Sequence, residues 1–77
     1  MNEQAEAIYQ RVKAEAAAKG KTSGGETTRV KWSRLWCYYY PMSRRFSWFG
    51  PSTNVTESLT KRQVISLINI ELEEGAE

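Results

Sequence analysis

Residues 27–49 read TTRVKWSRLWCYYYPMSRRFSWF, and this stretch decides the fold. Eight of the nine aromatic residues of the chain lie within it. Alternation of apolar and polar positions, with aromatic and β-branched residues, is typical of strands that have one apolar face. Pro41 holds Tyr40 extended and can occupy the second position of a turn over residues 40–43. The pattern therefore predicts an antiparallel β-hairpin with strands at about 27–40 and 44–49.

The first predicted strand separates into two sets of opposite parity. The set with most of the apolar bulk is Val30, Trp32, Trp36, Tyr38 and Tyr40. Arg34 interrupts this set, which indicates a bulge or bend at Ser33-Arg34. We expect the apolar set to face the core, and four residues to face outward: Arg29, Lys31, Leu35 and Tyr39. A chain this short has few other bulky residues to bury, so four rings are expected mainly in the core: Trp32, Trp36, Phe46 and Trp48.

Helices are predicted on both sides of the hairpin. In residues 3–19 the apolar positions fall at steps of three and four, and Gly20 follows as a stop. In residues 61–74 a wide apolar surface follows a capping box formed by Thr60 and Gln63. Residues 20–26 read as a flexible linker, and residues 52–55 could add a short third strand.

These elements predict one small domain of the α+β class over residues 1–77. The expected order is helix, antiparallel β-hairpin, helix, in a two-layer sandwich with both helices on one sheet face. A chain of 77 residues is near the lower limit for independent folding, so a homodimer is a further way to supply buried area.

Composition excludes several kinds of chemistry. The chain has no histidine, its acidic residues are all glutamate, and Cys37 is its single cysteine. General acid–base catalysis and metal binding draw on the missing residue types, so we expect a protein that is not an enzyme and has no metal or other cofactor. One cysteine cannot form an intramolecular disulfide, and no apolar run approaches the ~20 residues of a membrane span. A cytoplasmic protein without membrane contact is therefore expected.

Charge points to a binding surface on the hairpin. Residues 29–49 contain no acidic residue and five cations: Arg29, Lys31, Arg34, Arg44 and Arg45. Aromatic faces and fixed positive charge hold unstacked bases and phosphates. The leading hypothesis is a small non-enzymatic binding module whose hairpin engages nucleic acid or another polyanion. The five cations would contact phosphates, and Tyr39 and Phe49 are the stacking candidates.

A second hypothesis uses the same residues for a different partner. Tyrosine and arginine also dominate the energetics of protein–protein interfaces. The chain could therefore be an accessory protein of the phage or mobile-element type. It would inhibit or adapt a host protein by binding an acidic surface of that protein through the same patch, or through the apolar last helix.

The start of the last predicted helix carries Lys61 and Arg62, against the sign that the helix dipole favours there. Free amides and two cations at this end could hold an anion, whereas ordinary surface charge is the simpler interpretation. The order helix, strands, helix resembles a double-stranded RNA-binding domain in topology alone. Only Lys61 and Arg62 correspond to the basic motif of that family, so its function is not carried over.

Overall fold

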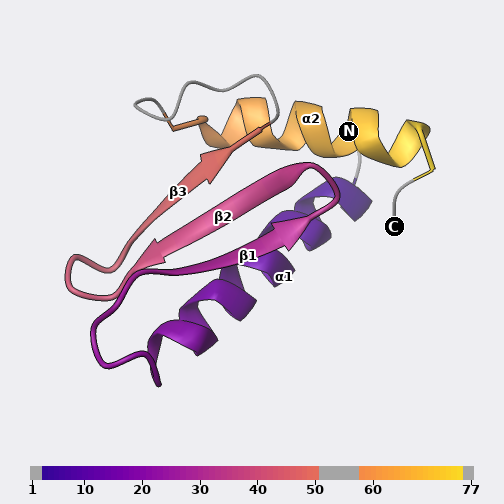
Figure 1. The fold of residues 1–77 in the computed structure, drawn as a ribbon. Coiled ribbons are helices and arrows are strands. Elements are labelled where there is room, and N and C mark those ends of the chain that lie inside the picture. Colours follow the sequence, from indigo (N-terminus) through magenta and orange to yellow (C-terminus); the bar gives the residue numbers. More distant parts are fainter. Residues whose placement is uncertain (1–2, 51–57, 76–77) are drawn as a thin grey trace.

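The computed structural model describes residues 3–50 and 58–75. Its elements are α1 (Glu3–Gly20), β1 (Thr28–Trp32), β2 (Leu35–Tyr40), β3 (Arg45–Phe49) and α2 (Lys61–Glu73). The strands form one antiparallel sheet in the order β1-β2-β3, and both helices contact it (Figure 1). The α+β class predicted from the sequence is confirmed.

The sheet has three strands because the stretch 27–40, predicted as one long strand, forms both β1 and β2. Trp32 pairs with Leu35, which leaves Ser33 and Arg34 as the two central residues of a hairpin turn. Ser33 has a φ of 54°, in the left-handed region that such tight turns require. The expected bend is therefore a complete chain reversal. The short strand expected at residues 52–55 lies outside the described residues.

This turn changes which residues of β2 face the core. Residues paired across an antiparallel ladder lie on the same face of the sheet. Buried Trp32 therefore places its partner Leu35 on the inner face, together with Cys37 and Tyr39. The predicted inward orientation of Trp36, Tyr38 and Tyr40 is wrong, as is the predicted outward orientation of Leu35 and Tyr39.

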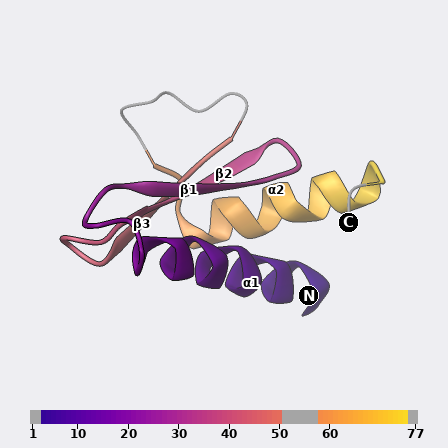
Figure 2. The same cartoon turned by 60° about the horizontal axis from the view of Figure 1, so that its bottom comes forward.

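The core lies between the inner face of the sheet and the two helices. Its buried members come from all five elements: Ala5, Ile8, Tyr9, Val12, Ala16, Val30, Trp32, Leu35, Cys37, Trp48, Val64 and Ile68. Tyr9 of α1 stacks on Trp48 of β3, with ring centroids 5.2 Å apart. Figure 2 shows α1 running along one side of the sheet. Trp32 and Trp48 are core residues as expected and Phe46 packs against the core, whereas Trp36 lies on the opposite face.

The last turn of α1 packs closely on the central strand. A Cβ atom at Gly20 would lie 2.4 Å from the ring of Tyr39, so a larger residue would displace that ring. The segment that follows, predicted as a flexible linker, contains its own hydrogen bonds. Ser23 donates through Oγ to the carbonyl of Gly20 at 3.0 Å, and the amide of Thr22 donates to the carbonyl of Lys19 at 3.2 Å.

The predicted capping box of α2 is confirmed. The Thr60 hydroxyl accepts from the Gln63 amide at 3.3 Å, and the Gln63 side chain accepts from the Thr60 amide at 2.9 Å. Val64 and Ile68 are fully buried on the face of this helix that turns toward the core.

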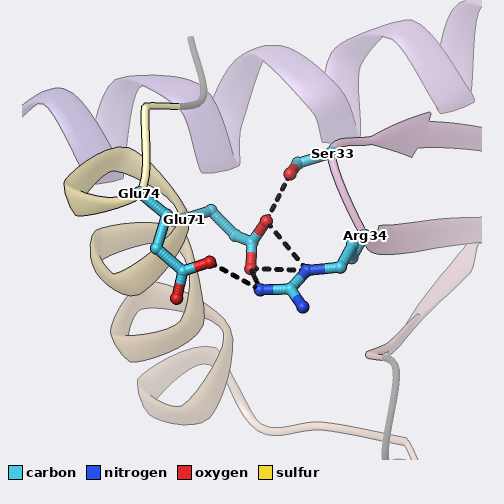
Figure 3. Close-up of polar contacts among 4 residues, drawn as sticks. All are labelled: Ser33, Arg34, Glu71 and Glu74. Atoms are coloured by element: carbon cyan, nitrogen blue, oxygen red, sulfur yellow. Dashed lines mark hydrogen bonds and ion pairs between the residues drawn. The ribbon is translucent and has the colours of Figure 1, made fainter.

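A polar cluster, here named the turn clamp, joins the β1–β2 turn to the end of α2 (Figure 3). Its members are Ser33, Arg34, Glu71 and Glu74. Ser33 Oγ donates to the Glu71 carboxylate, and Arg34 Nη2 lies 2.7 Å from Glu71 Oε2 and 2.9 Å from Glu74 Oε1. Glu71 is only 6 % exposed, so the clamp gives a buried carboxylate its partners.

Candidate nucleic-acid interface

The face of the sheet turned away from the helices, here named the outer face, carries rings and cations in ordered rows. The register pairs Lys31 of β1 with Trp36 of β2, and Trp36 with Phe49 of β3. In the next row Arg29 pairs with Tyr38, and Tyr38 with Ser47; in the third row Tyr40 pairs with Arg45. The three cations are exposed, and the rings are half-buried. Residues 27–49 contain no acidic residue, so this face has a charge of +3 that no carboxylate on the same strands offsets.

Trp36 lies at the centre of this face, on the middle strand. The guanidinium carbon of Arg29 is 5.0 Å from its ring centroid, and Lys31 Nζ is 5.4 Å away. Both distances are within the range of a cation–π interaction. Two cations of β1 thus converge on one ring of β2.

Tyr38 and Phe49 form a second aromatic unit on the outer face. Their ring centroids are 5.4 Å apart and their planes meet at 88°, an edge-to-face arrangement. Phe49, which the sequence proposed as a stacking residue, is thus placed on the face that could use it.

Tyr39, the other stacking candidate predicted from the sequence, does not lie on the outer face. Its ring lies on the inner face, 4.8 Å from the ring of Phe46 and over Gly20. Trp36 and Tyr38 occupy the positions that sequence reasoning gave to Tyr39. The signal that could have found them is the Ser33-Arg34 pair, two polar residues between two apolar runs, which is the length of a tight hairpin turn.

Arg34 also differs from its predicted role as a free phosphate contact. It lies at the tip of the hairpin, where its guanidinium is hydrogen-bonded to Glu71 and Glu74 of the turn clamp. Hydrogen bonds from Arg34 and then from Ser33 lower the pKa of Glu71, so the carboxylate remains ionised beside its partners. This arginine belongs to the clamp.

Arg44 and Arg45 are exposed at the other end of the hairpin. Arg45 belongs to β3 and pairs with Tyr40, which places it on the outer face. Arg44 is in the preceding turn with a φ of 59°, and its amide donates to the carbonyl of Tyr40 at 2.7 Å. Both remain candidates for phosphate contact.

Lys61 and Arg62 lie on α2, which packs on the other side of the sheet from these rows. Lys61 Nζ is 3.3 Å from Glu6 Oε2 and 5.3 Å from the centroid of the Tyr9 ring. The capping box uses the Gln63 amide, one of the donors that an anion at this helix start would need. The structure therefore does not bring this predicted anion site together with the outer face.

The thiol of Cys37 and the acidic side chains are the remaining groups to consider for reactivity or metal binding in the described part of the chain. Cys37 is fully buried, and burial raises the pKa of its thiol to about 12, which keeps it protonated and unreactive. Within residues 3–50 and 58–75, no three metal-ligating side chains form a cluster that could hold a metal ion. Neither helix in that part of the chain is both long and apolar enough to cross a bilayer.

Fold and face together define a small α+β module with a basic, ring-bearing sheet surface. No protein-family model, curated protein or solved structure matches the chain. The chemistry of the outer face is therefore the basis for assigning a function to this chain.

Proposed function

We propose that this chain is a non-enzymatic cytoplasmic module that binds nucleic acid through the outer face of its sheet. The observation that supports the proposal is the Trp36 ring, with Arg29 and Lys31 at 5.0 and 5.4 Å, on strands without any carboxylate. A ring and a cation at adjacent positions match a base and its phosphate.

When a ligand binds, Arg29 and Lys31 can replace their cation–π contacts with Trp36 by contacts with phosphates, while a base stacks on the Trp36 ring. A cation–π contact at an exposed site contributes ~0.5–1 kcal/mol. A base stacked on the same ring contributes ~1–3 kcal/mol, and each cation released from the ring can then pair with a phosphate. In this proposal Arg29, Lys31 and Arg45 contact phosphates directly, with Arg44 at the margin, while Trp36 and the Tyr38–Phe49 pair receive bases.

The test measures affinity for a labelled oligonucleotide at several salt concentrations. Replacing both β1 cations, as Arg29→Gln with Lys31→Gln, should weaken binding and reduce the slope of log affinity against log salt by about 1.4–1.8, because each cation paired with a phosphate adds roughly 0.7 for a single strand and roughly 0.9 for a duplex. The matched control is Arg11→Gln with Lys21→Gln, which removes the same charge from exposed positions off the sheet. Absence of binding at low salt, or equal losses in both double variants, would overturn the proposal.

A protein with an acidic surface is the competing occupant of the same face. Capture from a lysate with and without nuclease separates the two ligands, because a stoichiometric protein partner survives the nuclease and a nucleic acid does not. Light scattering on the purified protein tests the homodimer, which would bury the outer face between two copies.

A further inference from the structure

We infer that the ligand of the outer face is single-stranded nucleic acid, held with one unstacked nucleotide on each of three successive rows of the sheet. The inference rests on the proposed function and deepens it by naming the form of the nucleic acid. The rows are Lys31 with Trp36, Arg29 with Tyr38, and Arg45 with Tyr40. Each contains one ring from β2 and one cation from a neighbouring strand.

The spacing of the rings selects the conformation of the ligand. Outward residues of an antiparallel strand repeat every two positions, so neighbouring rings on β2 are rooted ~6.8 Å apart. Stacked nucleotides of one strand in a duplex are spaced at ~3.4 Å along the axis. Two adjacent bases can cover two adjacent rings only if the stack between those bases is opened, and a flexible single strand opens it most readily.

A duplex also hides the surface that these rings would contact. Base pairs present only their edges in the grooves, whereas their faces are covered by neighbouring pairs. Proteins that open a duplex insert an apolar wedge between base steps. Trp36, Tyr38 and Tyr40 are instead half-buried on the sheet, and Arg29 and Lys31 lie over the ring of Trp36. This geometry fits bases that have already left the stack.

The cations give the bound strand a path across the face. Lys31 and Arg29 are successive outward residues of β1, beside Trp36 and Tyr38. Two consecutive phosphates can therefore follow β1 while their bases extend over β2. Arg45 supplies the third cation from β3, beside Tyr40. The Tyr38–Phe49 pair broadens the middle of the platform toward β3.

The experiment compares three ligands of matched phosphate number by fluorescence anisotropy: an unstructured single strand of sixteen thymidines, a blunt-ended duplex of eight base pairs, and an abasic single strand. The single strand should bind at least tenfold more tightly than the other two. Its affinity should climb steeply over chains of one to three nucleotides and only slowly beyond three. The same three ligands made of RNA, with uridine in the single strand, repeat the comparison, and a tenfold preference for the single strand in either series supports the inference.

The variant that isolates stacking is Trp36→Leu. Its affinity for the single strand should fall about 5- to 150-fold, the contribution of one base–ring stack at ~1–3 kcal/mol. Its affinity for the duplex and the abasic strand, and its salt slope, should stay unchanged. Trp36→Phe keeps a smaller ring and should retain most of the affinity. Met42→Ala, an exposed apolar residue in the β2–β3 turn, is the matched control and should bind as the parent chain does.

Failure of this inference and failure of the proposed function give different results. Equal affinity for the three ligands, with a salt slope that still depends on Arg29 and Lys31, would overturn the single-strand inference and leave the proposed function standing. The single-strand inference would also be overturned if Trp36→Leu, shown by circular dichroism to be folded, bound the single strand like the parent. Absence of binding to every ligand at low salt would overturn both.

Discussion

The two faces of the sheet are both rich in aromatic residues, yet the neighbours of those rings differ. On the inner face, Trp48 stacks on Tyr9 among buried aliphatic side chains. On the outer face, Trp36 has the cations of Arg29 and Lys31 within 5.0 and 5.4 Å. Aromatic content alone therefore does not separate a core from a binding surface in a small protein. The cross-strand partners of the rings do: on the outer face cations of neighbouring strands pair with Trp36, Tyr38 and Tyr40. Cations also approach rings of the inner side, but they come from the helices, with Lys13 Nζ 4.8 Å from the Phe46 ring and Lys61 Nζ 5.3 Å from the Tyr9 ring.

The largest expected effect is the slow reaction of Cys37, whose thiol is buried on the inner face. The pKa of this thiol rises from its ordinary value of 9.0 to about 12 because of burial. The raised pKa strongly lowers the thiolate fraction near pH 8, and burial blocks the reagent as well. Labelling should be slow in the native protein and complete in denaturant. Fast labelling under native conditions would show that the inner face is open.

Substitutions at the adjacent residues Leu35 and Trp36 measure how much each face of the sheet contributes to stability. Leu35 is 1 % exposed, so Leu35→Ala should lower the free energy of unfolding by ~2–5 kcal/mol. Trp36→Leu changes the outer face and should lower it by less than about 1 kcal/mol. Urea denaturation followed by circular dichroism measures both. Equal losses would mean that Trp36 contributes to the core as Leu35 does.

The turn clamp should give the fold a dependence on acid. Arg34 and Ser33 lower the pKa of Glu71 below its ordinary value of 4.5, so the native state favours the ionised carboxylate. The resulting stability is present in full above the pKa of the unfolded chain and is lost as the pH falls through the lower pKa of the folded state. Thermal unfolding from pH 7 to pH 3 should show this loss, and Glu71→Gln should be less stable at pH 7 and less sensitive to acid.

The control for the clamp is Glu73→Gln, which changes an exposed glutamate of α2 that does not belong to the clamp. It should resemble the parent chain throughout this pH range. If Glu71→Gln and Glu73→Gln have the same acid profile, the clamp does not account for the pH dependence.

The smallest expected effect is at the opposite end of the hairpin, where Arg44 and Arg45 differ in backbone conformation. Arg44 has a φ of 59°, which glycine adopts without steric cost, so Arg44→Gly should raise the free energy of unfolding by about 0.5–1 kcal/mol. Arg45 is in β3, where glycine weakens a strand, so Arg45→Gly should lower it. Both remove one cation, so opposite shifts in urea denaturation would arise from backbone conformation. Shifts of the same sign would contradict this explanation.

Most of the fold follows from local sequence patterns. The two helices, the Thr60–Gln63 capping box and the strand ending at Phe49 were all predictable, because each depends on residues close in the chain. The turn at Ser33-Arg34 was predicted only as a bend, since neither residue is a glycine or asparagine that would mark a reversal. Arg34 and Ser33 of this turn hydrogen-bond to Glu71, which is 37 and 38 residues away in sequence. Hydrophobic periodicity does not predict a contact over such a separation.

The error at this turn had consequences for the candidate site. A strand has a side-chain period of two, so treating two paired strands as one continuous strand exchanges the faces of every residue after the turn. Arg29 and Lys31, before the turn, were placed correctly on the outer face. The sequence pattern therefore exchanges Tyr39 with Trp36 and Tyr38. It also predicts a free Arg34, because the partners of this arginine lie on α2, far away in sequence.

The most direct test of the central claim is an NMR titration of the three tryptophan indole N–H signals with a single-stranded oligonucleotide. Trp32 and Trp48 lie in the core, and Trp36 lies on the outer face. Assignment by Trp36→Phe identifies the reporter. We predict that the Trp36 signal shifts strongly on binding and that the other two move little. Binding with an unchanged Trp36 signal, or with the largest shift at Trp32 or Trp48, would contradict the assignment of the outer face as the nucleic-acid interface.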